Sequence, residues 1–213
     1  MSTSDGAAQR ASTSTRADAP TSEVILGAAF RILAREGYQG LPARSVAEEA
    51  GTNLALGNYY FGGKKGMLLA LYERLEHDRF RRQKSMYADP NEPLSSKFRR
   101  AIEFYRKDLS DGFVRVHHEL QDQGFADPAL AERAKQRVVS WSQLLEDVAA
   151  QYLPELGVSL PADRLVAGFA AFWYGMEQHH LLGLNEAEVP YFAVLDGIGD
   201  WLEQREAAVA RRD

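Results

Sequence analysis

The sequence contains no cysteine among its 213 residues. This absence excludes disulfide frameworks, thiolate zinc sites and thiol nucleophiles together. It agrees with a reducing compartment, and we expect a soluble cytoplasmic protein.

Long apolar runs are missing as well. The longest run, Leu165 to Met176, is too short to span a bilayer, and no secretory hydrophobic segment follows Met1. We therefore expect no membrane partner.

The sequence also lacks the motifs of common enzyme classes. It has no Gly-rich phosphate loop and no nucleophile elbow, and Gly62-Gly63-Lys64-Lys65 lacks the spacing and the preceding strand of a P-loop. The sequence contains two pairs of adjacent histidines, His117-His118 and His179-His180. The two side chains of each pair would point about 100° apart on a helix, so neither pair chelates a metal by itself. We predict no catalytic activity, no cofactor and no metal site.

No strand-like alternation appears beyond residues 88–93, where every segment has helical character, and no repeat or low-complexity tract appears after residue 20. We predict an all-α fold of about nine helices. Residues 1–20 are interpreted as a disordered arm, residues 21–87 as a helix-turn-helix domain with a long connecting helix, and residues 88–213 as a helical bundle. The expected helices begin near Thr21, at Pro42, at Leu54 and at Lys64, followed by 94–110, 113–123, 128–152, 161–182 and 189–211.

The chain is organised around residues 50–67. Gly51 supplies the positive φ that closes one helix, and Thr52 or Asn53 caps the next through a side-chain oxygen. Two helices joined by such a short turn meet at a steep angle, so the helix Leu54 to Tyr60 is placed to enter a DNA major groove.

The side chains of this short helix suit DNA. Asn58 can pair with adenine, Leu54 and Ala55 can touch thymine methyl groups, and Tyr59 or Tyr60 can reach phosphates. The spacing alone fits equally well an ordinary helical hairpin with half-buried tyrosines.

A series of ordered matches resembles the N-terminal domain of TetR-family transcriptional regulators. The matching segments are Gly37-Tyr38, Arg44 to Gly51, Asn53-Leu54-Ala55, Asn58 to Lys64 and Met67-Leu68-Leu69. The resemblance implies a homodimer that binds a palindromic operator and responds to a small molecule. The DNA contacts that we predict are Arg44, Asn53, Leu54, Ala55, Asn58, Tyr59, Tyr60 and Lys64.

Three positions depart from that pattern. Thr52 and Gly57 stand where the family usually has bulky aliphatic residues, and Tyr60 stands where histidine is frequent. Glycine within a helix costs about 1 kcal/mol relative to alanine, so either this helix is less rigid or its backbone approaches the first helix closely.

Charge separates the two parts of the chain. Residues 1–87 hold 12 Lys and Arg against 9 Asp and Glu, a net charge of +3, whereas the remainder carries a net −8. A polyanion responds to the local field, so the N-terminal part is the predicted DNA-binding part. Of its basic residues, Arg44 also has Glu48 as an i,i+4 partner, and the run Arg79, Arg81, Arg82 and Lys84 is interpreted as a solvated face.

The C-terminal part is predicted to bind a small, mostly apolar effector and to form the dimer through its last two helices. Those helices are apolar on more than one face, which requires cover from a partner. Polar and aromatic residues within apolar helices are the candidate ligand contacts, and for each of them core packing is the alternative: His117, Trp141, Trp173, Tyr174, Glu177 and His180. We predict a ligand-responsive regulator, most simply a repressor; the alternative is a helical ligand-binding or adaptor protein without specific DNA binding.

Overall fold

A computed structural model describes residues 19–211, and this range contains helices and no strands. The predicted arm falls on residues 1–20, of which 1–18 lie outside the described residues. The all-α prediction is confirmed. The elements are α1 (Ala19–Glu36), the 3-10 turn η2 (Tyr38–Gly40), α2 (Ala43–Glu49), α3 (Leu54–Phe61), α4 (Lys64–Met86), α5 (Leu94–Ser110), α6 (Phe113–Gln123), α7 (Pro128–Tyr152), α8 (Ala162–Leu181) and α9 (Tyr191–Ala210).

Predicted and observed helix ends agree closely where capping signals are local. Helices α5, α6 and α7 begin and end at the predicted residues. Asp127 caps α7 by accepting a hydrogen bond from the Ala129 N–H at 2.9 Å. The largest shift is at α1, which begins at Ala19, before the predicted cap.

The chain divides into two compact units, and the division falls inside α4, between Leu71 and Tyr72. Lys64 to Leu71 therefore belong with α1, α2 and α3, and the rest of α4 belongs with the later helices. The turn at residues 88–93 joins α4 to α5 within the second unit.

The first unit is built on the periodic face of α1. The buried residues there recur at the helical spacing that the sequence predicts: Ile25, Ala28, Ala29, Ile32 and Leu33. In the same unit, these residues are also buried: Leu41, Val46, Met67, Leu68 and Leu71. Helix α1 contacts both α2 and α3, and α2 contacts α3, so this core holds the short helices in place.

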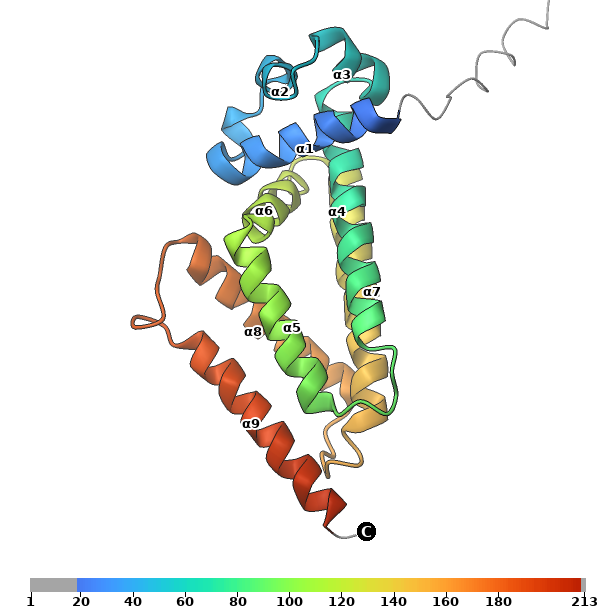
Figure 1. Ribbon diagram of the computed structural model, residues 1–213, viewed down its shortest axis with the longest axis vertical. Coiled ribbons are helices and arrows are strands. Elements are labelled where there is room, and N and C mark those ends of the chain that lie inside the picture. Colours follow the sequence, from blue (N-terminus) through green and yellow to red (C-terminus); the bar gives the residue numbers. More distant parts are fainter. Residues whose placement is uncertain (1–18, 212–213) are drawn as a thin grey trace, which may run out of the picture. The chain divides into compact units, whose positions relative to one another are not determined.

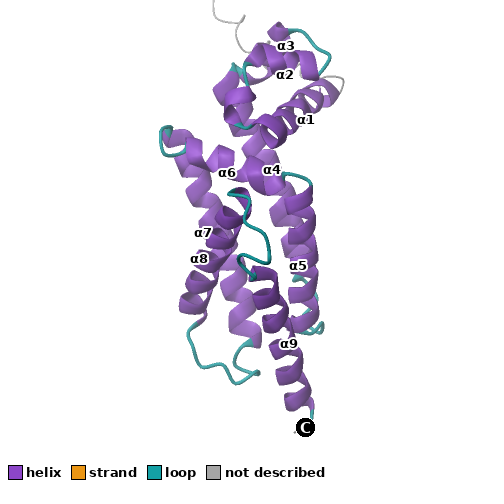
Figure 2. Cartoon of the chain, turned by 90° about the vertical axis from the view of Figure 1, so that its left-hand side faces the viewer, coloured by secondary structure: helices purple, strands orange, loops and turns teal. Residues whose placement is uncertain are grey.

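The second unit is a helical bundle in which α7 packs on α8, α5 packs on α9, and α6 contacts both α5 and α7 (Figures 1 and 2). One core cluster joins α5, α6, α8 and α9 through Ile102, Tyr105, Val114, Trp173, Met176, Tyr191 and Leu195. A second cluster joins α7 and α8 through Ala149, Leu153 and Val166. In the described part of the chain, no helix is long and apolar enough to cross a membrane.

Candidate DNA-binding and effector sites

The turn between α2 and α3 has the predicted geometry. Gly51 has a φ of 63°, a left-handed conformation that disfavours a side chain. Asn53, not Thr52, caps α3, because its Oδ1 accepts a hydrogen bond from the Leu56 N–H at 3.1 Å. The side chain of Asn53 is therefore already engaged in orienting the short helix.

Helix α3 ends at a glycine pair. Gly62 is left-handed, with a φ of 67°, and its N–H donates to the Asn58 carbonyl at 2.9 Å. Gly63 has a φ of 113°, and α4 starts at the next residue. The two positive φ values turn the chain sharply, so the N-terminus of α4 directly follows the end of α3.

Most of the predicted base contacts on α3 are exposed, although Leu54 and Asn58 also line the small cavity beneath this helix. Leu54 and Tyr59 are 47% and 75% exposed, and Asn53, Ala55 and Asn58 are also exposed. Tyr60 is half-buried, and its ring meets that of Tyr59 edge-on at 5.2 Å between centroids. Among these side chains, only Tyr60 has the half-buried position that the hairpin interpretation assigned to both tyrosines.

Arg44 extends from the first turn of α2 and is paired within its own helix. Its Nε donates to the Glu48 carboxylate at 2.9 Å, while both side chains remain mostly exposed. An exposed pair of this kind contributes only about 0.3 to 0.5 kcal/mol. A phosphate can therefore compete with Glu48 for the guanidinium.

Lys64 lies at the N-terminus of α4, where free backbone N–H groups favour an anion. Its ammonium lies 3.8 Å from the centre of the Tyr38 ring. This cation–π contact fixes the side chain without neutralising its charge.

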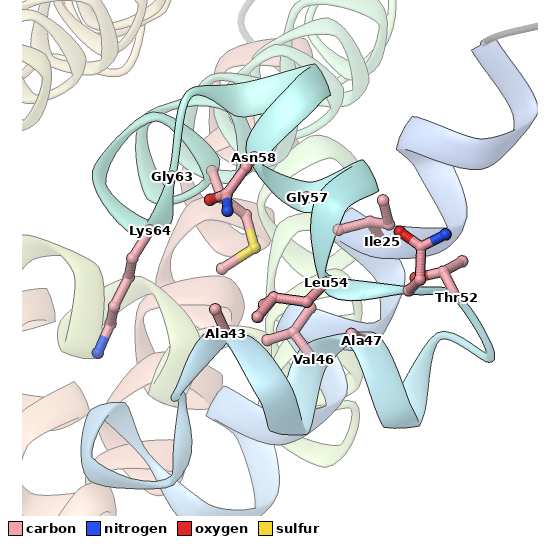
Figure 3. Close-up of a pocket in the computed structure, with 12 residues that line it drawn as sticks. Ile25, Ala43, Val46, Ala47, Thr52, Leu54, Gly57, Asn58, Gly63 and Lys64 are labelled. Carbon is pink, nitrogen blue, oxygen red and sulfur yellow. The ribbon is translucent and has the colours of Figure 1, made fainter.

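A cavity of about 20 Å³ lies beneath α3, between α1, α2 and the start of α4 (Figure 3). Gly57 lines it, and a Cβ built at Gly57 would meet no atom within 4 Å. The expected close approach of this backbone to α1 is therefore wrong. Thr52 also lines the cavity, and its hydroxyl is buried without a hydrogen-bond partner among the described residues.

The second unit contains a much larger cavity, of about 600 Å³, bounded by α4, α5, α7, α8 and α9. This volume falls in the range of small-molecule sites. All three tryptophans of the chain line it, Trp141, Trp173 and Trp201. The other lining side chains that we use below are Phe98, Phe169, Leu145, Arg79, Arg82 and Tyr105.

Only two of the six predicted ligand residues, Trp141 and Trp173, line this cavity. Glu177 lies directly behind it, because its carboxylate accepts a hydrogen bond from the Trp173 indole N–H at 3.0 Å. His117 is buried at 2% exposure on α6, Tyr174 is 40% exposed, and His180 is half-buried near the end of α8. The structure does not bring these three residues to the cavity wall.

Glu177 belongs to a buried polar group that connects α6 and α8. His118 Nε2 donates to the Glu177 carboxylate at 2.8 Å, and the Gln178 amide donates to His118 Nδ1, also at 2.8 Å. Burial alone would raise the pKa of Glu177, but the hydrogen bond from His118 and the charges of Arg79, His118 and Arg137 outweigh it and lower the pKa. Glu177 is therefore an ionised carboxylate that holds Trp173 in place.

His117 lies in a separate polar group with α4 and α7. Its Nδ1 is 3.5 Å from Glu76, which also accepts a hydrogen bond from Arg137 at 2.9 Å. Burial, followed by the charges of Arg137 and Arg79, lowers the pKa of His117 well below its usual value. The imidazole is therefore neutral at pH 7, and its contact with Glu76 is not an ion pair.

Arg79 corrects the interpretation of residues 79–84 as a solvated face. It is only 6% exposed and lines the cavity, whereas Arg81 is exposed and pairs with Asp78 at 3.2 Å. The signal was present in the sequence, because Arg79 continues the stripe of Tyr72 and Leu75, and Met86 follows two turns later on the same face. A charged residue in the register of a buried stripe points into the core.

The described histidines and carboxylates do not gather into a metal site. Among residues 19–211, no three His, Asp or Glu side chains come together in a way that would hold a metal ion. His179 is exposed, and His118 uses both ring nitrogens in hydrogen bonds to protein groups.

The first unit is similar to a known protein family. Residues 25–71 match the model of "Bacterial regulatory proteins, tetR family". No curated protein matched the chain.

Solved structures share the fold over most of the chain. A transcriptional regulator from Saccharomonospora viridis, solved in complex with choline, is 22% identical with a TM-score of 0.71, over 87% of this chain and 95% of the other. A TetR-family regulator from Rhodococcus sp. is 23% identical with a TM-score of 0.66, over 86% and 99%. The multidrug binding protein EbrR, complexed with imidazole, is 26% identical with a TM-score of 0.57, over 82% and 92%.

Proposed function

This chain belongs to the TetR family of bacterial transcriptional regulators, and from this we propose that it is a repressor that leaves its DNA operator when a small molecule fills the cavity of the second unit. The observation that carries the proposal is the pairing of an exposed, capped reading helix, α3, with a cavity of about 600 Å³ in the same chain. The cytoplasmic location expected above belongs to this proposal, since the operator is there.

The proposed DNA contacts divide into two kinds. Asn58, Leu54 and Ala55 are exposed on α3 and read bases, while Arg44, Lys64 and the tyrosines hold phosphates. Asn53 acts at one remove, because its side chain caps the helix that carries the readers.

The proposed homodimer uses α8 and α9, as the family resemblance implies. Along one side of α8, a Cβ at Gly168 or Gly175 would meet no atom within 4 Å, and Ala171 between them is exposed. On α9, Gly197 is equally open and Val194 is 47% exposed. A partner helix can approach such a face closely, and a two-fold axis would place the same face of a second copy against it.

Helix α4 is the proposed path from ligand to DNA. Its residues Arg79, Arg82 and Met86 line the cavity, and its first residue is Lys64. The protein has one state that binds the operator and one that does not. A ligand shifts the balance between these two states if it binds them with different affinities.

The experiment that tests the DNA role compares two variants on an operator selected from a random duplex pool. Asn58→Ala should cost about 1 to 3 kcal/mol on the operator and little on random DNA, whereas Lys64→Ala should weaken both alike and flatten the salt dependence. Fluorescence anisotropy measures both affinities. Failure to select any operator, with only weak and sequence-independent binding, would favour the alternative of a ligand-binding protein without specific DNA binding.

A further inference from the structure

We propose that the effector is an amphiphile with an anionic end, a carboxylate or a phosphate, which binds the buried guanidinium of Arg79. This inference rests on the proposed function, because it assumes that the cavity of about 600 Å³ is the effector site. It adds the charge of the ligand and the residue that selects it.

The first step is the state of Arg79. The residue is 6% exposed, and with the described residues it forms no hydrogen bond and no ion pair; its Nε is buried without an acceptor. The ring of Phe113 lies 5.5 Å from the guanidinium carbon. A cation–π contact at that distance is weak relative to the several-kcal/mol cost of burying an unpaired charge.

The second step is that the neighbouring carboxylates are already bonded to other donors. Asp108 accepts from Arg82 at 2.5 Å, Glu76 accepts through Oε2 from Arg137 at 2.9 Å, and Glu177 accepts from His118 and Trp173. The other oxygen of Glu76, Oε1, is buried without a hydrogen-bond partner among the described residues, so it does not accept from Arg79 either. The positive charge of Arg79 acts through space on Glu76 and Glu177 and favours the ionised form of each carboxyl group. Neither supplies an acceptor to its N–H groups.

The third step concerns the other hydrogen-bond donors near Arg79 on the cavity wall. Arg82 lies one turn away on α4, and its Nε is also buried without an acceptor among residues 19–211. Within the same range the Tyr105 hydroxyl on α5 is buried without a hydrogen-bond partner, and burial raises the pKa of Tyr105, so it keeps its proton. The Arg82–Asp108 ion pair ties α4 to the turn of α5 that follows Tyr105, so the unmatched donors share one region.

The fourth step is the match between this region and the rest of the cavity. Three donors without acceptors fit a group that only accepts hydrogen bonds, which is the property of a carboxylate or phosphate. Asp108, which is paired with Arg82, and Gln83 also line the cavity. The rest of the wall is mostly apolar and aromatic and suits an acyl or aromatic body: Phe98, Leu145, Leu153, Val158, Leu165 and Phe169.

An aromatic wall also suits a quaternary ammonium ion, which binds through cation–π contacts. A cation placed in this cavity would share it with the guanidinium of Arg79, which is only 6% exposed, and like charges repel more strongly where burial limits screening by water. Arg79 therefore favours the anion over the cation.

The test compares three ligands that share one tail and differ in the charge of the head: decanoate, decanol and decyltrimethylammonium, each below its micelle concentration. Quenching of tryptophan fluorescence reports binding, because all three tryptophans line the cavity. We expect decanoate to bind at least about tenfold more tightly than decanol, since a hydrogen bond to a charged group is worth about that factor. Tightest binding by decyltrimethylammonium, or equal binding of decanoate and decanol, would overturn the inference while leaving the cavity as the effector site.

Variants at two positions on the same wall sharpen the test. Arg79→Met should weaken decanoate about 10- to 100-fold and leave decanol unchanged, whereas Arg79→Lys should retain preference for decanoate. Without ligand, Arg79→Met should melt at the same or a higher temperature, because it removes an unpaired buried charge. The matched Arg82→Met should melt at a lower temperature, because it leaves the buried Asp108 without its ion-pair partner.

Two further outcomes count against the inference. If Arg79→Met destabilises the ligand-free protein as much as Arg82→Met, or fails to fold, the guanidinium is structural and the inference is overturned. If none of the three ligands binds the wild-type protein, the cavity is not an effector site, and that part of the proposed function fails together with the inference, while the DNA role is judged separately by operator binding.

Discussion

The ammonium of Lys64 lies 3.8 Å from the centre of the Tyr38 ring, so a turn that follows α1 orients the first residue of α4. We expect Tyr38→Leu to weaken binding to all duplexes about two- to fivefold, the factor that corresponds to an exposed cation–π contact. Because the charge of Lys64 remains, the salt dependence of binding should stay that of the wild type, in contrast to Lys64→Ala. Fluorescence anisotropy over a salt series distinguishes the two variants; an increase in affinity for Tyr38→Leu would show that the ring competes with phosphate.

The ion pair between Arg44 and Glu48 predicts that Glu48 restrains DNA binding. Glu48→Gln should raise affinity for operator and random duplexes severalfold and steepen the salt dependence, because it frees Arg44 and removes a negative charge from the first unit. The matched control is Glu36→Gln, which removes the same charge from an exposed pair with Arg35. Equal gains for both variants would assign the effect to net charge alone.

Gly57 predicts a stabilising substitution. Its position is helical and a Cβ there would meet no atom within 4 Å, so Gly57→Ala should stabilise the protein by about 1 kcal/mol. Gly62→Ala should have the opposite sign and cost about 1 to 2 kcal/mol, because the φ of 67° at Gly62 is left-handed. Urea denaturation measures both changes, and a loss of stability in Gly57→Ala would mean that α3 requires the glycine for another contact.

His117 predicts a pH dependence of stability. Its pKa is lower in the folded protein than in the unfolded chain, so between the two values the unfolded chain binds more protons and the free energy of unfolding falls with decreasing pH. The loss should begin below about pH 6.5 and reach at most about 1.4 kcal/mol per pH unit. His117→Phe keeps a ring against Tyr72 and Phe113 but does not titrate, so its stability should fall less from pH 7.5 to 5.5.

Glu177 and Glu76 titrate in both proteins, with a lowered and a raised pKa respectively, so their contributions largely cancel in this comparison. Urea denaturation at several pH values gives the two slopes. Parallel slopes for wild type and His117→Phe would show that the buried imidazole is protonated without penalty.

The open face of α8 predicts the dimer contact. Ala171→Glu would bury an unpaired carboxylate between the two copies and should yield monomers by light scattering. Ala150→Glu places the same charge at an exposed alanine of α7 and should leave the dimer intact. A stable dimer in both variants would place the interface elsewhere.

Local chemistry made much of this protein predictable from its sequence. Gly51, Asn53 and the Gly62-Gly63 pair define the reading helix through φ angles and a cap, all within a few residues. The Arg44–Glu48 pair was likewise expected, since i,i+4 neighbours share a helix face. The apolar period of α1 gave its buried face directly.

The residues that line the effector cavity could not be predicted from local sequence, because contacts between residues far apart in the chain determine them. His118 and Glu177 are 59 positions apart, and the carboxylate was predicted as a ligand contact because nothing local shows that a histidine of another helix holds it. Arg79 lay in the register of a buried stripe, yet a charged side chain is normally solvated, and only the packing of α4, α5 and α8 shows that it is enclosed. Local sequence thus determined which segments are helices and where α3 begins and ends, because those interactions span a few residues, whereas the packing of whole helices decided which polar groups lost their water and face the cavity.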